Sequence, residues 1–86
     1  MRSINVTITQ FVPSQSFVAT IDVVDDALGF SVVEDIPVVY RRVENHFAFF
    51  PDRNALNNAV SDSELRMDVI GAIDKTGTEY LDSQAE

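Results

Sequence analysis

The sequence predicts an α+β domain: a small, mainly antiparallel β-meander of four or five strands covered by one C-terminal helix. Before Pro51, apolar and polar residues alternate with the period of a half-buried strand; after it, the apolar period becomes helical. With 86 residues, 45% of them hydrophobic, the chain is long enough for only one core. We expect residues 1–81 to form this single domain and residues 82–86 to be a disordered acidic tail.

Four segments before Pro51 carry strand patterns. Residues 4–9 alternate cleanly, and a turn is expected at 13–16, where Pro13 removes a ladder donor and the residues after it are small and polar. Residues 17–24 alternate again and form the second strand. Residues 30–40 are interpreted as one irregular strand with an edge segment or bulge near Pro37, and 47–50 as a short fourth strand.

The sequence after Pro51 predicts a loop and then a helix. Residues 52–58 are polar and rich in asparagine, which indicates a loop or a short extra strand. Ser61 and Glu64 have capping-box spacing, so a helix is expected over 61–75, with Gly77 just past its end. The apolar stripe of this helix is Leu65, Val69, Ala72 and Ile73.

The predicted core combines the inner faces of the strands with this helical stripe. It consists of Ile4, Val6, Ile8, Ile21, Val23, Phe30, Val32, Phe47, Phe49, Leu65, Val69 and Ile73. A second apolar set, Val18, Val24, Val33, Val38, Val39 and Phe50, exceeds what one sheet and one helix can cover. We therefore expect a homodimer formed through strand edges or through these second apolar faces.

The charge balance disfavours a general nucleic-acid binder. Six basic and fourteen acidic residues give a net charge of -8, which repels phosphate backbones and anionic membranes. The ordinary interpretation of this acidity is solubility; the sharper one is that the surface imitates nucleic acid and occupies a basic site on another protein. With no cysteine and no apolar run of about 18 residues, we expect a soluble, cytoplasmic protein without membrane contact.

No catalytic or metal-binding pattern is present. His46 is the only histidine and is expected at a solvent-facing turn, so one chain cannot build a site from several imidazoles. The pairs Asp25–Asp26 and Glu34–Asp35 lack calcium-loop spacing, and neighbouring strand residues point to opposite faces. We expect these carboxylates to be unpaired and to repel one another. The sequence therefore predicts a protein that is not an enzyme and that uses no metal or cofactor.

Arg41–Arg42 is the only basic pair in the chain. One interpretation is a loop that contacts phosphate, with Tyr40 nearby to stack on a base. The other is a charged hairpin turn that balances the surrounding acids, because two arginines neutralise few phosphates against a charge of -8.

The order of these segments resembles the SpoVG family of small bacterial regulators. The resemblance rests on Ala19, Ile21, Val23 and Asp26, then FSVVEDIPV from Phe30, then FAFFP ending at Pro51, with a helix after them. It covers 4–51 and implies a pleated sheet with one covering helix, a dimer, and nucleic-acid binding.

The family's basic positions are mostly absent from this chain. Asp52–Arg53 follows Pro51, and the C-terminal tail is acidic, so Arg53 is the one basic position that transfers. Two hypotheses follow. The first is a non-enzymatic regulator of SpoVG type that binds nucleic acid weakly, through Arg41, Arg42 and Arg53, or acts through a protein partner. The second is an acidic phage or mobile-element inhibitor that blocks a basic nucleic-acid-binding site on a host protein.

Overall fold

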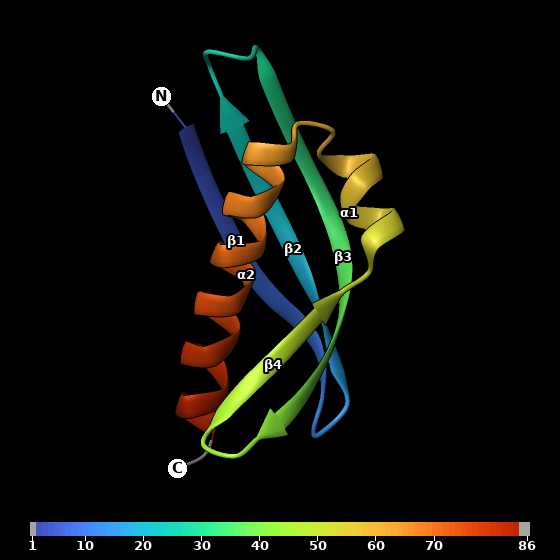
Figure 1. Cartoon of the computed structure of the whole chain (residues 1–86), viewed down its shortest axis with the longest axis vertical. Helices are drawn as coiled ribbons and strands as arrows, with labels where there is room; N and C mark the ends of the chain where they lie inside the picture. The colour runs from blue at the N-terminus through green and yellow to red at the C-terminus, as the bar shows by residue number, and fades with distance from the viewer. Residues whose placement is uncertain (1, 85–86) are drawn as a thin grey trace.

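Four strands and two helices follow one another in the computed structural model, which describes residues 2–84. They are β1 (Arg2–Val12), β2 (Ser16–Asp25), β3 (Phe30–Val43), β4 (His46–Pro51), α1 (Arg53–Ala59) and α2 (Ser63–Gln84). The strands form one antiparallel sheet in the order β1-β2-β3-β4, and α2 lies along one face of it (Figure 1). The predicted α+β meander with a C-terminal covering helix is confirmed.

The alternation along each strand separates a covered face from an open face. On β2, Phe17, Ala19, Ile21 and Val23 are fully buried beneath the helices, whereas Asp22 between them is exposed. The register continues this division onto β3, where Ala19 pairs with Ile36 and Phe17 pairs with Val38. The side chains of the intervening residues form the open face, which no helix covers within residues 2–84.

The predicted core is buried to different degrees. Its central members Ile21, Val23, Leu65, Val69 and Ile73 are fully buried, and the other predicted positions are partly buried around them. The sequence analysis omitted Phe17, Ala19, Ile36, Val38, Tyr40, Leu56, Ala59, Val60 and Leu81, all of which are buried. Val38 had been assigned to the second apolar set, and that assignment is wrong: it lies on the covered face with no exposed surface.

Of the two alternatives predicted near Pro37, the bulge is wrong and the edge segment is confirmed, because the β3–β4 pairing ends at Val38. The β2–β3 register runs without interruption from Ser16↔Val39 to Asp25↔Phe30, with Pro37 opposite Val18. Proline fits here because β4 pairing ends at Val38↔Pro51, and the Pro37 carbonyl accepts the Asp52 N–H at 2.8 Å. The irregularity lies in β1 instead, between Thr9 and Val12, next to Gln10 with its φ of 48°.

Residues 53–59 are helical, so the predicted loop or extra strand at 52–58 is wrong. The Asp52 side chain caps α1 by accepting the Ala55 N–H at 3.0 Å. Leu56 and Ala59 are buried, and Val60, immediately after the helix, has no exposed surface. The asparagines that indicated a loop lie on the solvent side of a short helix fixed by these apolar contacts.

The C-terminal helix is longer than predicted and begins with a different cap. Asp62, rather than Ser61, accepts the Leu65 N–H on its carboxylate at 2.9 Å, and its carbonyl accepts the Arg66 N–H. Gly77 is a buried residue inside α2 and does not end it. The helix also includes residues 82–84 of the expected disordered tail, and residues 85–86 lie outside the described residues.

The sheet curls so that α2 contacts both of its edge strands, β1 and β4 (Figure 1). The right-handed twist that strands adopt accumulates across the sheet and carries β4 toward the C-terminal part of α2. One end of the molecule is therefore formed by the β1–β2 turn, the β3–β4 turn and the end of α2 together. Within residues 2–84, no helix is long and apolar enough to cross a membrane.

Candidate functional site

The three predicted binding arginines lie on two different surfaces. Arg41 and Arg42 are neighbours on β3, so their side chains leave opposite faces of the sheet. The Arg41 guanidinium lies 5.7 Å from the ring centroid of Phe50, and that of Arg42 lies 6.0 Å from the ring centroid of Phe47. Arg53, the first residue of α1, borders the same groove as Phe50. Arg41 and Arg53 thus both lie in the neighbourhood of Phe50, whereas Arg42 lies against Phe47.

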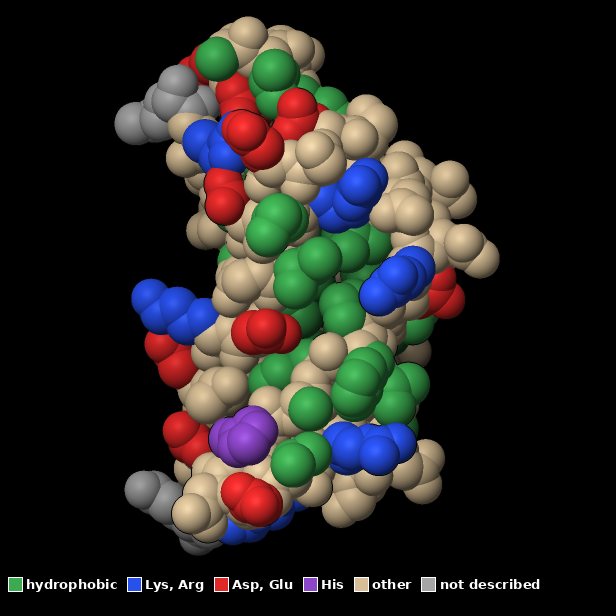
Figure 2. All heavy atoms as spheres, viewed as in Figure 1, with side chains coloured by type: hydrophobic (Ala, Val, Ile, Leu, Met, Phe, Trp, Pro, Cys, Tyr) green, Lys and Arg blue, Asp and Glu red, His purple; other side chains and the backbone are tan. Residues whose placement is uncertain are grey.

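Phe50 is the centre of the first surface, which we call the Phe50 platform and which comprises Val39, Arg41, Phe50 and Arg53. Phe50 is 52% exposed, and its cross-strand partner Val39 is 56% exposed. A groove of about 240 Å³ runs beside Phe50, lined by Phe49, Phe50, Pro51, Arg53, Leu56 and Ile70. Figure 2 shows hydrophobic side chains gathered between α2, α1 and β4, with Lys or Arg side chains along the α1 side. An exposed ring with one guanidinium group beside it and a second arginine on the adjoining groove suits a planar, anionic partner.

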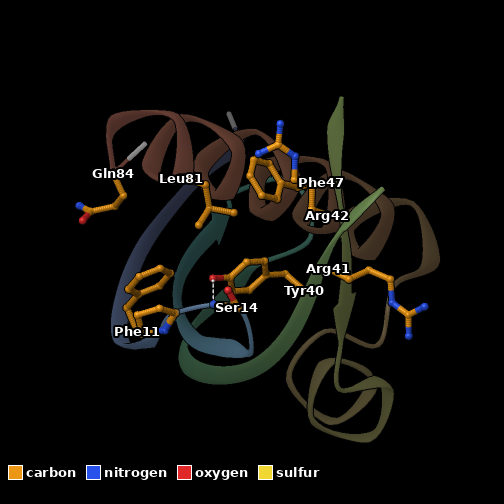
Figure 3. A pocket seen from close by; sticks show the side chains of 9 residues that line it. Phe11, Ser14, Tyr40, Arg41, Arg42, Phe47, Leu81 and Gln84 are labelled. Carbon is orange, nitrogen blue, oxygen red and sulfur yellow. Dashed lines mark hydrogen bonds between the residues drawn. The ribbon is translucent and has the colours of Figure 1, made fainter. Parts of the chain in front are cut away.

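The second surface is a cavity of about 500 Å³ at the end where the two turns meet α2; we call it the aromatic cavity. Its lining residues are Phe11, Pro13, Ser14, Tyr40, Arg41, Arg42, Phe47, Leu81 and Gln84. Figure 3 shows Arg42 beside the Phe47 ring, whereas Arg41 points away from the cavity. Although fourteen of the 86 residues are acidic, no Asp or Glu among residues 2–84 lines this cavity.

Tyr40 fixes the floor of the aromatic cavity. Its hydroxyl oxygen accepts the backbone N–H of Ser14 at 2.6 Å, which joins β3 to the β1–β2 turn (Figure 3). The Tyr40 ring is stacked on Phe11 at a centroid distance of 6.0 Å and meets Phe47 edge-on at 6.1 Å. Tyr40 is only 6% exposed, so the packing of neighbouring side chains fixes the orientation of its ring.

The sequence analysis placed Tyr40 beside the arginines but missed the convergence of Phe11 and Phe47 with it. Phe11 and Phe47 each lie one residue from a strand end next to a turn, and Tyr40 lies three residues before the end of β3. That position is the only sequence signal that could have indicated a shared cavity. Their meeting depends on the curl of the sheet, which the local pattern does not specify.

Asp25 is the buried carboxylate among the described residues. Arg2 Nε donates to Asp25 Oδ2 at 2.8 Å, and a second N–H of the same guanidinium donates to Asp68 on α2. The Arg2 hydrogen bond, helped by the Leu28 N–H, holds the pKa of Asp25 below its usual value, despite burial. Conversely, Asp25 and Asp68 raise the pKa of Arg2. The expectation that Asp25 is an unpaired, repelled carboxylate is wrong.

No group of three or more His, Cys, Asp or Glu side chains is arranged to hold a metal ion within residues 2–84. His46 is exposed at the start of β4, as the sequence predicted. Asp35, on the open face, accepts the Thr20 hydroxyl at 2.7 Å.

No protein-family model matches the chain, and comparisons with curated proteins and with solved structures found no significant match.

Proposed function

We propose that this protein is a non-enzymatic regulatory protein of SpoVG type that binds single-stranded nucleic acid weakly through the Phe50 platform. The observation that carries the proposal is the exposed Phe50 ring with Arg41 5.7 Å from its centroid and Arg53 beside the same groove. A base stacks on the exposed ring, and the two guanidinium groups contact the phosphates on either side of it. Arg42 lies outside this surface and is not part of it.

The net charge of -8 supports weak binding rather than tight binding. Two arginines release few counterions, and the remaining carboxylates oppose association at long range. For a single strand, each phosphate contact contributes about 0.7 to the slope of log affinity against log salt concentration. We expect a slope near 1.4, from two contacts.

The test is fluorescence anisotropy of a labelled oligothymidylate at low and at moderate salt. Phe50→Ser should weaken binding about fivefold or more, because a base–aromatic stack is worth roughly 1–3 kcal/mol. Arg41→Gln and Arg53→Gln should each weaken binding and reduce the salt slope by about 0.7. Lys75→Gln, an exposed position on α2, is the control with the same change in charge. Equal weakening by Lys75→Gln would show that only net charge matters and would refute the platform.

The second candidate function is an acidic inhibitor that occupies a basic site on a host nuclease or DNA-binding protein. It is favoured by the solvent side of α2, where Glu64, Asp68, Glu79 and Asp82 are all exposed. This protein would ignore the oligothymidylate and co-purify with a basic protein, and that association would weaken with Glu79→Gln and not with Phe50→Ser. The two functions therefore respond to different variants.

We also propose a homodimer, formed by pairing of the β1 edges. Within residues 2–84, β1 has β2 as its only hydrogen-bonded neighbour, and its eleven residues contain neither proline nor lysine, which usually protect such edges. Its only charged residue, Arg2, is held by Asp25 and Asp68. Pairing at β1 leaves the Phe50 platform free, because β4 is the opposite edge of the sheet.

Light scattering at tens of micromolar tests the dimer and its geometry. Thr7→Asp places like charges near each other across two antiparallel β1 strands and should give a monomer mass. Val33→Asp alters the open face, where Val33 is 64% exposed, and should leave the β1-edge dimer intact. A monomer mass for the unaltered protein would rule out the dimer, and dissociation by Val33→Asp alone would assign it to the open face.

We propose a cytoplasmic location for the protein. The chain has no cysteine, so its fold does not depend on an oxidising compartment. Expression in a reducing cytoplasm should give the same thermal unfolding midpoint as secretion to the periplasm.

A further inference from the structure

The aromatic cavity is a second site that the proposed nucleic-acid binding does not use. Its volume of about 500 Å³ is within the range of roughly 300–1,000 Å³ typical of small-ligand sites. Three strand-end aromatics and Leu81 supply an apolar wall, and the open mouth lies between the two turns and the end of α2. The cavity is therefore large enough for one small molecule rather than for a protein segment.

The polar groups around the cavity are cationic or neutral. Arg42 lies at the edge of the cavity. Its Nε donates to the Glu44 carbonyl at 3.3 Å, and its guanidinium group lies over the Phe47 ring. This hydrogen bond uses Nε and positions the guanidinium, while Gln84 on α2 brings an amide to the opposite side. Within residues 2–84 the only charged side chains that line the cavity are those of Arg41 and Arg42, and this favours an anion over a cation as the polar part of the ligand.

The apolar part of the ligand follows from the rings. Phe11 and Tyr40 are nearly parallel, with 14° between their planes, and Phe47 stands at 67° to Tyr40. Such walls offer ring faces and edges to a flat body, which gains both apolar burial and aromatic contacts there. We propose that the aromatic cavity binds a small molecule in which a planar aromatic ring system carries one anionic group, the ring lying against Tyr40 and Phe47 and the anion at Arg42.

The probe for this proposal is 8-anilinonaphthalene-1-sulfonate, a planar aromatic anion whose fluorescence rises on transfer to an apolar site. The chain has no tryptophan, so the signal belongs to the probe. N-phenyl-1-naphthylamine has the same aromatic rings without the charge and is the matched neutral probe. We expect saturable binding of one sulfonate probe per chain, with at least tenfold lower affinity for the neutral probe.

Two variants at opposite sides of the cavity test the role of charge. Arg42→Gln and Gln84→Glu should each lower the affinity for the sulfonate probe at least fivefold. The affinity for the neutral probe should stay unchanged. Both positions are exposed, so neither change removes a core contact, and circular dichroism verifies the fold. Arg53→Gln, at the Phe50 platform, is the control with the same charge change as Arg42→Gln and should leave probe binding unchanged.

The outcomes separate this proposal from the nucleic-acid proposal. Binding without saturation, equal affinity for the two probes, or equal weakening by Arg42→Gln and Arg53→Gln would each overturn the aromatic-anion site. Phe50→Ser should not alter probe binding, although it abolishes the nucleic-acid stack. Adenosine monophosphate competing with the sulfonate probe would assign the ligand to nucleotides, and competition by benzoate alone would assign it to aromatic carboxylates; either result supports the site.

Discussion

The ring of Phe49 on β4 lies directly against the backbone of Gly77 on α2. A methyl group placed on Gly77 would come within 2.7 Å of Phe49 Cε1 and 2.9 Å of Cζ. The ring cannot move away freely, because Phe17, Tyr40 and Phe47 surround it at centroid distances of 6.0, 6.4 and 6.5 Å. Gly77 thus allows α2 to approach the curled edge of the sheet.

Gly77→Ala should destabilise the protein by about 1–3 kcal/mol, because the added methyl overpacks the contact with Phe49. Gly71→Ala is the control on the same helix: nothing lies within 4 Å of its added Cβ, so helix propensity should stabilise the protein by about 0.5–1 kcal/mol. Urea unfolding of both variants gives the comparison. Combining Gly77→Ala with Phe49→Leu should restore part of the loss; similar gains from both glycine substitutions would contradict the clash.

Asp62→Ala should cost about 1 kcal/mol, because the Leu65 N–H at the start of α2 loses its cap. Ser61→Ala should change the unfolding free energy little, since Ser61 is not the cap in this structure. Thermal unfolding of the two variants checks this prediction. A larger loss from Ser61→Ala would instead favour the capping box expected from the sequence.

Tyr40→Phe should cost about 1–2 kcal/mol while leaving the ring contacts in place. The substitution removes the hydroxyl that accepts the partly buried Ser14 N–H at 2.6 Å. Amide hydrogen exchange at Ser14 should accelerate in the variant, whereas exchange within α1 should not. Unchanged exchange at Ser14 would mean that another acceptor replaces the hydroxyl.

The Arg2–Asp25 pair should make stability fall under acid conditions. The folded pKa of Asp25 lies below its ordinary 3.8, so its stabilising contribution is complete above that pH and is lost as the pH falls toward the folded pKa. Arg2→Gln should reduce stability at pH 7 and make the acid loss shallower. Urea unfolding between pH 7 and pH 2.5 measures both effects, and parallel curves for the two proteins would show that the pair contributes nothing.

Protonation of Asp74 should affect stability in the opposite direction to protonation of Asp25. Asp74 lies on the exposed side of α2, but partial desolvation raises its pKa above the ordinary 3.8, so a small cost of its charge is present at neutral pH and is relieved as the pH falls through the raised value. Asp74→Asn should therefore stabilise the protein at pH 7 and have little effect in acid. The same urea series checks this, and a destabilising effect at pH 7 would indicate that the carboxylate has a favourable partner.

Local pattern was sufficient to predict the strands, the meander order and the central core. The period-two alternation of 17–24 corresponds to the buried and exposed residues of β2, because consecutive strand residues must face opposite sides. Local pattern was insufficient at Asp52–Ala59. The polar composition of this segment indicated a loop, whereas the segment forms a helix that buries Leu56 and Ala59. Apolar contacts that are distant in sequence decided that element.

The sequence by itself determined the fold class, because binary patterning fixes which side of each strand and helix avoids water. Only the tertiary structure decided which side chains share a surface. Arg41 lies beside Phe50, Arg53 borders the groove next to that ring, and Phe11, Tyr40 and Phe47 meet around one cavity, because the sheet curls around α2. That curl depends on strand twist together with the space that Gly77 leaves for Phe49, and neither is visible until residues far apart in the chain are placed side by side.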